Sequence, residues 1–120
     1  MIAAEIAGWA KAFALTLAIE LPIAGWLFAR VEPDVRRRLG LIVVANLVSH
    51  PIVWFVMPRL FPSHNWMVVA AEAWAVLSEA LLYAHAFPSA GTRRALGVSA
   101  LANGASFGAG LLLRALTGWV

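Results

Sequence analysis

The sequence contains four long stretches of predominantly apolar residues, separated by short polar connections. The apolar stretches cover residues 9–29, 39–58, 66–87 and 96–118, and the connections cover residues 30–38, 59–65 and 88–95. A helix needs about 20 apolar residues to cross the hydrocarbon core of a bilayer. Each stretch has that length and lacks the alternation of a barrel strand, so we predict four transmembrane helices. Because the connections are short, consecutive helices should run antiparallel in an up-down four-helix bundle.

The composition is typical of a membrane protein. Hydrophobic residues make up 62% of the 120 residues, charged residues make up 12%, and the mean hydropathy is +0.83. A soluble domain is about 45–50% apolar and about 25% charged. The chain has no cysteine, which excludes disulfides, thiolate metal sites and thiol redox chemistry. We therefore expect one all-α transmembrane domain over residues 1–120, with the lipid bilayer as its main partner.

One pattern occurs twice in the sequence. Residues 36–49 and 93–106 share Arg-Arg-x-Leu-Gly-x4-Ala-Asn-x2-Ser, with seven identities in fourteen positions. The apolar stretch before each segment contains a glutamate, Glu20 in the first and Glu79 in the second. We interpret the chain as two tandem helical hairpins, about residues 9–58 and 66–118. A unit with an even number of crossings enters the membrane in the same direction each time, so the copies should be related by a pseudo-two-fold axis along the membrane normal.

This symmetry places two acidic and two amide side chains at one depth. At about 1.5 Å per residue, Glu20, Asn46, Glu79 and Asn103 each lie ~12–15 Å from the hairpin tips. Helical spacing gives each helix a polar face, and these faces should converge on the interior because contact with lipid is costly. The residues that share these faces and support the layer are Ser49, His50, Glu72, Tyr83 and Ser106.

The predicted layer can hold protons. A charged side chain at mid-membrane costs at least ~2.5–3.5 kcal/mol on insertion scales, so an unpaired Glu20 or Glu79 would take up a proton. A cation could replace such protons, and the amide oxygens of Asn46 and Asn103 could complete an oxygen-rich shell for a hard metal or a sodium ion. A protonated glutamate bonded to an asparagine is also ordinary interhelical contact, worth ~0.6–2 kcal/mol. The sequence does not distinguish a proton or cation site from an ordinary interhelical contact. It also does not identify which metal, if one binds, the layer would hold.

Three functions are compatible with this layer. The first is a small integral membrane transporter or channel for protons, cations or cationic compounds; a bundle of this size leaves little room for a pathway, so we expect a homodimer or a larger membrane complex. The second is a non-catalytic accessory or assembly subunit of a larger complex, with the layer joining the helices. The third is a cofactor-binding module that uses His50, but a haem would need an axial partner that the chain lacks at that depth, so we expect no cofactor.

Catalytic motifs do not favour an enzyme. The sequence contains neither the HExxH motif of zinc proteases nor a Gly-x-Ser-x-Gly elbow. Its one aspartate, Asp34, lies in a connection, which excludes an intramembrane aspartyl dyad. Ser49 and His50 are adjacent, so on a helix they point ~100° apart and cannot form a nucleophile pair. We therefore expect no catalytic residues.

The basic residues predict an orientation. They gather in the first and third connections, at Arg30, Arg36, Arg37, Arg38, Arg93 and Arg94, whereas the opposite side carries Lys11, Arg59 and Arg114. By the positive-inside rule both hairpin tips face the cytoplasm and both termini face outside, and we expect an integral protein of the bacterial inner membrane. The sequence pI is about 10.7. No basic stripe is interleaved with aromatic residues, so we expect no nucleic-acid partner.

The plan resembles one family of exporters. Each two-helix unit has a membrane glutamate in its first helix and an asparagine in its second: Glu20 with Asn46, and Glu79 with Asn103. In this architecture the chain is similar to the small proton-coupled multidrug exporters of the proteobacterial antimicrobial compound efflux family, and the resemblance implies proton-coupled export. That family has Arg-x-x-His ahead of the glutamate, where this sequence has residues 13–16 (FALT) and 74–77 (WAVL). We treat the resemblance as a shared design and not as membership.

Overall fold

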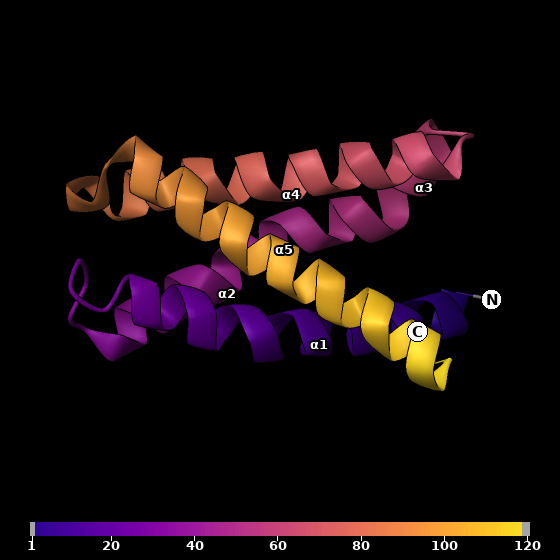
Figure 1. Ribbon diagram of the computed structural model, residues 1–120, viewed down its shortest axis with the longest axis horizontal. Coiled ribbons are helices and arrows are strands. Elements are labelled where there is room, and N and C mark those ends of the chain that lie inside the picture. The colour runs from indigo at the N-terminus through magenta and orange to yellow at the C-terminus, as the bar shows by residue number, and fades with distance from the viewer. Residues whose placement is uncertain (1, 119–120) are drawn as a thin grey trace.

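The structure is a computed structural model that describes residues 2–118, and over this range the chain is helical without strands. Within these residues, four helical stretches are long and apolar enough to cross a membrane. They are α1 (Ile2–Leu27), the stretch Val35–Leu60, α4 (His64–Ala86) and α5 (Gly91–Thr117). Successive stretches run in opposite directions (Figure 1), and a short 3-10 helix (Pro88–Ala90) joins α4 to α5. The predicted all-α class is confirmed.

Helix ends differ from the predicted bounds by several residues. The helix α1 begins at Ile2 instead of residue 9, so the N-terminal segment is helical as well. The second stretch begins at Val35, four residues before the predicted start at residue 39, because Asp34 caps it. Its carboxylate accepts hydrogen bonds from the backbone N–H groups of Arg36 (3.1 Å) and Arg37 (3.5 Å). Such a cap satisfies backbone donors that the first turn of a helix leaves free.

The second stretch is interrupted, where the sequence predicted one continuous helix over residues 39–58. It consists of α2 (Val35–Pro51), a π-helical segment (Ile52–Val56) and α3 (Met57–Leu60). Pro51 has no N–H to donate to the preceding turn, and this weakens the regular α-helical pattern there. The indole N–H of Trp74 on α4 donates to the carbonyl of Ser49 at 3.2 Å, so the chain is tied to α4 just before the change. π-Helical turns occur frequently at functional sites.

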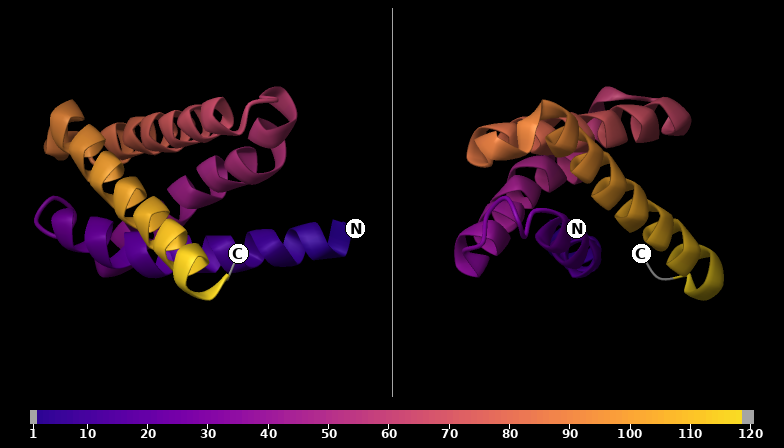
Figure 2. Two further views of the ribbon diagram at one scale, coloured as in Figure 1. Left: turned by 45° about the vertical axis from the view of Figure 1, so that its right-hand side comes forward. Right: turned by 60° about the vertical axis from the view of Figure 1, so that its left-hand side comes forward.

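The helices pack in a ring in which α1 contacts α2, α2 contacts α4, α4 contacts α5 and α5 contacts α1. The two hairpin turns lie at one end of the bundle, which we call the tip end, and both termini lie at the other, which we call the terminal end (Figure 1). From the tip end, α5 starts beside α4 and then diverges from it toward the C-terminus (Figure 2). The bundle is therefore closed at the tip end and more open between α4 and α5 at the terminal end.

The tip end contains the apolar core and a hydrogen bond between the hairpins. The core comprises Ala24, Phe28, Ile42, Ala45, Tyr83, Phe87, Ala95 and Val98. The guanidinium of Arg37 donates to the carbonyl of Ala86 at the end of α4 (3.1 Å) and pairs with the carboxylate of Glu32 (3.6 Å). A cation there is favoured because the C-terminal carbonyls of a helix carry partial negative charge.

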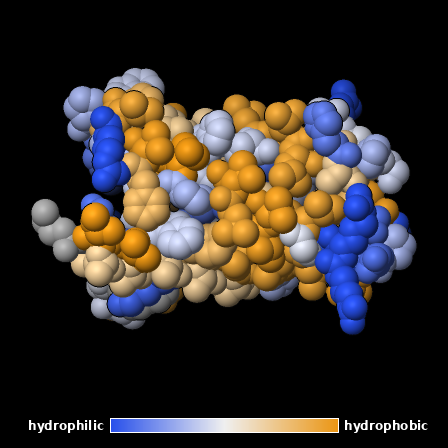
Figure 3. Space-filling model, turned by 180° about the vertical axis from the view of Figure 1, so that it is seen from behind, coloured by the Kyte–Doolittle hydropathy of each residue, from blue (hydrophilic) through white to orange (hydrophobic). Residues whose placement is uncertain are grey.

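The outer surface is apolar around the middle of the bundle. Large side chains such as Leu77 and Leu101 are 61% and 57% exposed. On the face shown in Figure 3, hydrophobic residues form a belt and hydrophilic residues gather at the two ends. Soluble monomers rarely expose so much contiguous apolar surface, whereas membrane proteins require it.

Candidate functional site

The structure brings the four predicted residues of the polar layer together inside the bundle. Glu20, Asn46 and Glu79 are at most 1% exposed, and Asn103 is 5% exposed. They come from α1, α2, α4 and α5, one from each helix of the ring. The side chains of Glu20 and Glu79 line the same cavity. The expectation that all four side chains point inward therefore agrees with the structure.

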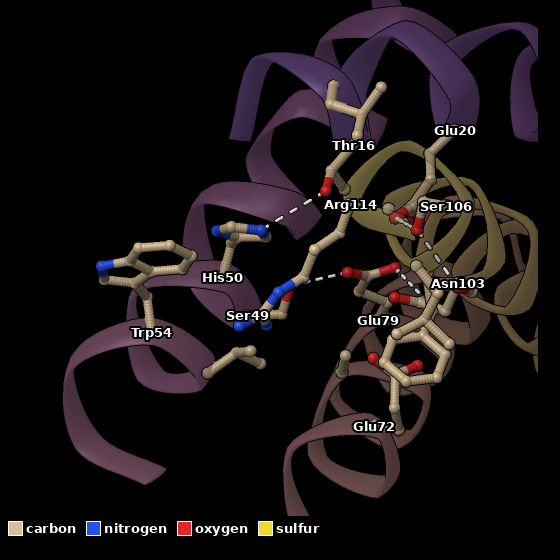
Figure 4. A pocket seen from close by; sticks show the side chains of 16 residues that line it. Thr16, Glu20, Ser49, His50, Trp54, Glu72, Glu79, Asn103, Ser106 and Arg114 are labelled. Carbon is tan, nitrogen blue, oxygen red and sulfur yellow. Dashed lines mark hydrogen bonds between the residues drawn. The ribbon is translucent and has the colours of Figure 1, made fainter. Parts of the chain in front are cut away.

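Glu79 has a hydrogen-bond donor for each of its carboxyl oxygens. The hydroxyl of Ser49 on α2 donates to Oε1 at 2.6 Å, and the amide of Asn103 on α5 donates to Oε2 at 2.8 Å (Figure 4). Both donors are buried side chains, with Ser49 1% and Asn103 5% exposed. These bonds connect α4 to the helix on each side of it.

Glu20 has fewer partners. The hydroxyl of Ser106 on α5 donates to its Oε2 at 2.9 Å. Its other oxygen, Oε1, is buried and has no hydrogen-bond partner among the residues that the structure describes. A buried polar atom without a partner is costly, so this oxygen requires a proton, a water molecule or a cation beside it.

The two serines of the repeated pattern bond across the hairpins. Ser49 of the first pattern donates to Glu79, and Ser106 of the second pattern donates to Glu20. The asparagines do not follow this reciprocity. Asn46 donates to the carbonyl of Ile42 on its own helix (3.0 Å), as Asn103 does to that of Ser99 (2.9 Å), but only Asn103 also reaches a carboxyl group. Asn46 Oδ1 is buried without a partner within residues 2–118.

A cavity of about 240 Å³ adjoins the layer. In every helix, the cavity residues lie at the level of the layer or on its terminal side. On α1 they run from Leu15 to Glu20, on α4 from Glu72 to Glu79, and on α5 from Asn103 to Arg114. A second cavity of about 670 Å³ shares Trp54, Glu72 and Arg114 with the first and extends to His64 at the start of α4. Together they connect the carboxyl pair with the terminal end of the bundle.

Aromatic side chains close the opposite side of the layer. Phe28 and Tyr83 are fully buried, and Phe87 is 2% exposed. The ring centroids of Phe28 lie 5.0 Å from Tyr83 and 4.7 Å from Phe87. These three residues, which we call the aromatic plug, lie between the polar layer and the hairpin turns. The carboxyl pair is therefore reached from one end of the bundle.

The supporting residues lie in or next to this cavity. His50 and Glu72 line it, Ser49 and Ser106 bond the carboxyl groups, and Tyr83 belongs to the aromatic plug with a hydroxyl that has no partner in the described chain. The ring of His50 packs against Trp9 and Phe13, and its Nε2 lies 3.3 Å from the hydroxyl of Thr16. These contacts fix the ring by packing, while its Nδ1 is buried without a hydrogen-bond partner within residues 2–118.

The layer offers few ligands for a multivalent metal. Within residues 2–118, no three His, Cys, Asp or Glu side chains converge so that they could hold a metal ion. The Nδ2 atom of Asn103 faces Glu79, so this side chain serves the carboxyl group as a donor. The arrangement suits a proton or a monovalent cation better than a divalent metal, which prefers several charged oxygen ligands.

Sequence reasoning missed three parts of the site. The sequence predicted for Arg114 only a place on the side opposite the hairpin tips, whereas its exposed side chain lines both cavities and forms no ion pair within the described chain. Trp54 had no predicted role, and it lines both cavities as well. The aromatic plug had a sequence signal, because Phe28 and Phe87 each follow a layer glutamate by eight residues.

Comparisons of the sequence with protein-family models and with curated proteins, and of the chain with solved structures, give no match. The resemblance to the efflux family therefore rests on architecture alone.

Proposed function

We propose that this protein spans a membrane as a small transporter or channel for protons or monovalent cations, with Glu20 and Glu79 as the groups that bind them. The observation that carries the proposal is the position of the carboxyl pair at the closed end of a one-sided cavity. A structural hydrogen bond needs no cavity beside it. A site that exchanges ions needs access, and a site that prevents a free leak needs closure on one side.

The electrostatic surroundings support a cationic cargo. Glu72 lines both cavities and precedes Glu79 by seven residues on α4, on the terminal side of the layer. Acidic groups at increasing depth would attract a cation from the terminal end toward the layer. Arg114 is the basic residue that lines the cavities, and it lies on the exposed side, so it can limit the passage of larger cations.

The proposal includes an orientation and a symmetry. The hairpin tips with their arginines face the cytoplasm, so the cavity opens to the outside of a bacterial inner membrane. The reciprocal Ser49–Glu79 and Ser106–Glu20 bonds support two hairpins related by a pseudo-two-fold axis. A homodimer or larger assembly would complete the pathway, because a single bundle of this size has little interior space.

The test is flux through reconstituted protein. Glu20→Gln and Glu79→Gln should each abolish proton-linked flux in proteoliposomes while the protein still folds, because glutamine has nearly the same shape and cannot carry a proton. Glu5→Gln is the matched control, since Glu5 is an exposed residue near the N-terminus, 4.0 Å from Arg59. Wild-type flux in both layer variants would refute the proposal.

A second candidate function has one observation in its favour. The hydrogen bonds of both carboxyl groups cross between helices, as expected if the layer only joins the helices of an accessory or assembly subunit. A pull-down in gentle detergent with mass spectrometry separates the candidates. Stoichiometric recovery of larger membrane proteins, unaffected by Glu20→Gln, would favour the subunit.

A further inference from the structure

We propose that the two layer glutamates have different states, with Glu79 as the charged carboxylate and Glu20 as the holder of the exchangeable proton. The assignment deepens the proposed function, because it says which carboxyl group carries the proton. The assignment depends on the hydrogen bonds around each carboxyl group. The sequence alone does not distinguish Glu20 from Glu79, because the two hold equivalent positions in the repeated units.

The bonds to Glu79 are those of a charged group. Each of its oxygens already accepts a hydrogen bond, from Ser49 at 2.6 Å and from Asn103 at 2.8 Å. Hydrogen bonds from a hydroxyl to a charged carboxylate are about 2.5–2.7 Å long and are roughly twice as strong as neutral ones. A proton on Glu79 would displace the Asn103 amide from Oε2, or would turn the Ser49 hydroxyl from Oε1 to the carbonyl of Asn46, a longer contact of 3.4 Å.

The bonds to Glu20 leave a place for a proton. Ser106 donates to Oε2 at 2.9 Å, which is a longer contact than the Ser49–Glu79 bond, and Oε1 has no partner within residues 2–118. A proton can occupy Oε1 without displacing any hydrogen bond of Glu20. One proton on Glu20 and none on Glu79 therefore suits the hydrogen bonds of both side chains.

The difference arises from one missing bond. Asn46 occupies the position in α2 that Asn103 occupies in α5, and both amides bond the carbonyl four residues earlier. Asn103 also reaches Glu79, whereas Asn46 bonds neither glutamate.

The other titratable or charged groups that face this space are His50 on α2, Glu72 and Tyr83 on α4, and Arg114 on α5; α1 contributes Glu20 itself. No ion pair joins any of them to the layer glutamates within the described chain.

Infrared spectroscopy tests the assignment, because a protonated carboxyl group has a C=O stretching band that a carboxylate lacks. All variants are made with Glu72→Gln, so that Glu20 and Glu79 are the remaining buried carboxyl groups of the bundle. At neutral pH we expect the protonated-carboxyl band to disappear in Glu20→Gln and to persist in Glu79→Gln. Persistence in Glu20→Gln, or loss in Glu79→Gln alone, would overturn the assignment.

A second measurement needs no change at either glutamate. A hydrophobic carbodiimide reacts with protonated carboxyl groups in apolar surroundings, and mass spectrometry of the wild-type protein locates the adduct. We expect the adduct on Glu20, and an adduct on Glu79 would contradict the proposal. Both measurements report which carboxyl group is protonated, and neither measures transport. A failure of this assignment can therefore be distinguished from a failure of the transport proposal.

Discussion

Replacing the two layer asparagines by alanine gives the sharpest test of the asymmetry in the layer. Asn46→Ala and Asn103→Ala remove the same side chain from equivalent positions of the repeated pattern. Both amides bond the carbonyl four residues earlier, at 3.0 Å and 2.9 Å, and both side chains are buried. The variants therefore share the cost of a lost local bond and a similar small void. They differ chiefly in the bond from Asn103 to Glu79 (2.8 Å), because the further contact of Asn103 with the Ser99 hydroxyl is long, at 3.4 Å.

That bond determines the expected magnitude. A hydrogen bond to a charged group contributes about 1.5–3 kcal/mol in water-soluble proteins. Hydrogen bonds between membrane helices average about 0.6 kcal/mol and reach about 1.7 kcal/mol. Because Glu79 keeps the bond from Ser49, we expect Asn103→Ala to lower the free energy of unfolding by about 1–2 kcal/mol more than Asn46→Ala does.

The assay is reversible unfolding of the purified protein in mixed detergent, followed by circular dichroism. The pair of variants should be repeated with Glu79→Gln, where the extra cost of Asn103→Ala should shrink because the charged acceptor is gone. Equal losses of stability for the two asparagine variants, within about 0.5 kcal/mol, would show that the bond from Asn103 to Glu79 does not stabilise the protein.

Three further predictions address the cavity, the aromatic plug and the π-helical segment. In this cysteine-free chain, Gly110→Cys should react with a membrane-impermeant maleimide added from the terminal side, whereas Val98→Cys on the same helix should not; equal labelling would contradict a one-sided cavity. Phe28→Ala should lower the free energy of unfolding by about 3–5 kcal/mol and increase proton leak in proteoliposomes, since its ring contacts Tyr83 and Phe87; an unchanged leak would show that the plug does not seal the site. Pro51→Ala should restore a backbone donor and stabilise the protein by up to about 3 kcal/mol, with slower hydrogen exchange over residues 52–56. Unchanged exchange would mean that the π-helical segment does not depend on the proline.

The sequence predicted the class of fold and the content of the layer because both follow from simple spacing. Apolar stretches of about 20 residues leave few alternatives to membrane-length helices. The equivalent positions of Glu20 and Glu79 and of Asn46 and Asn103 indicated a common depth, and the cost of polar groups in lipid indicated an inward direction.

The rest depends on how the helices pack. Asn46 and Asn103 have nearly the same local sequence, so no local rule could tell which of them reaches a carboxyl group. The one-sided cavity arises because α5 diverges from α4 toward the terminal end (Figure 2), and helix spacing along the chain does not report such an angle. Pro51 marked a weak point in the second helix, but the π-helical turn after it also depends on neighbouring contacts such as Trp74 to Ser49.

The most direct test of the transport proposal is proton movement driven by a membrane potential in proteoliposomes that hold a pH-sensitive dye. Wild-type protein should acidify the lumen when the potential is negative inside, and protein with both Glu20→Gln and Glu79→Gln should leave the lumen unchanged. Identical traces from wild-type and doubly substituted protein would contradict the account, whether both acidify the lumen or neither does.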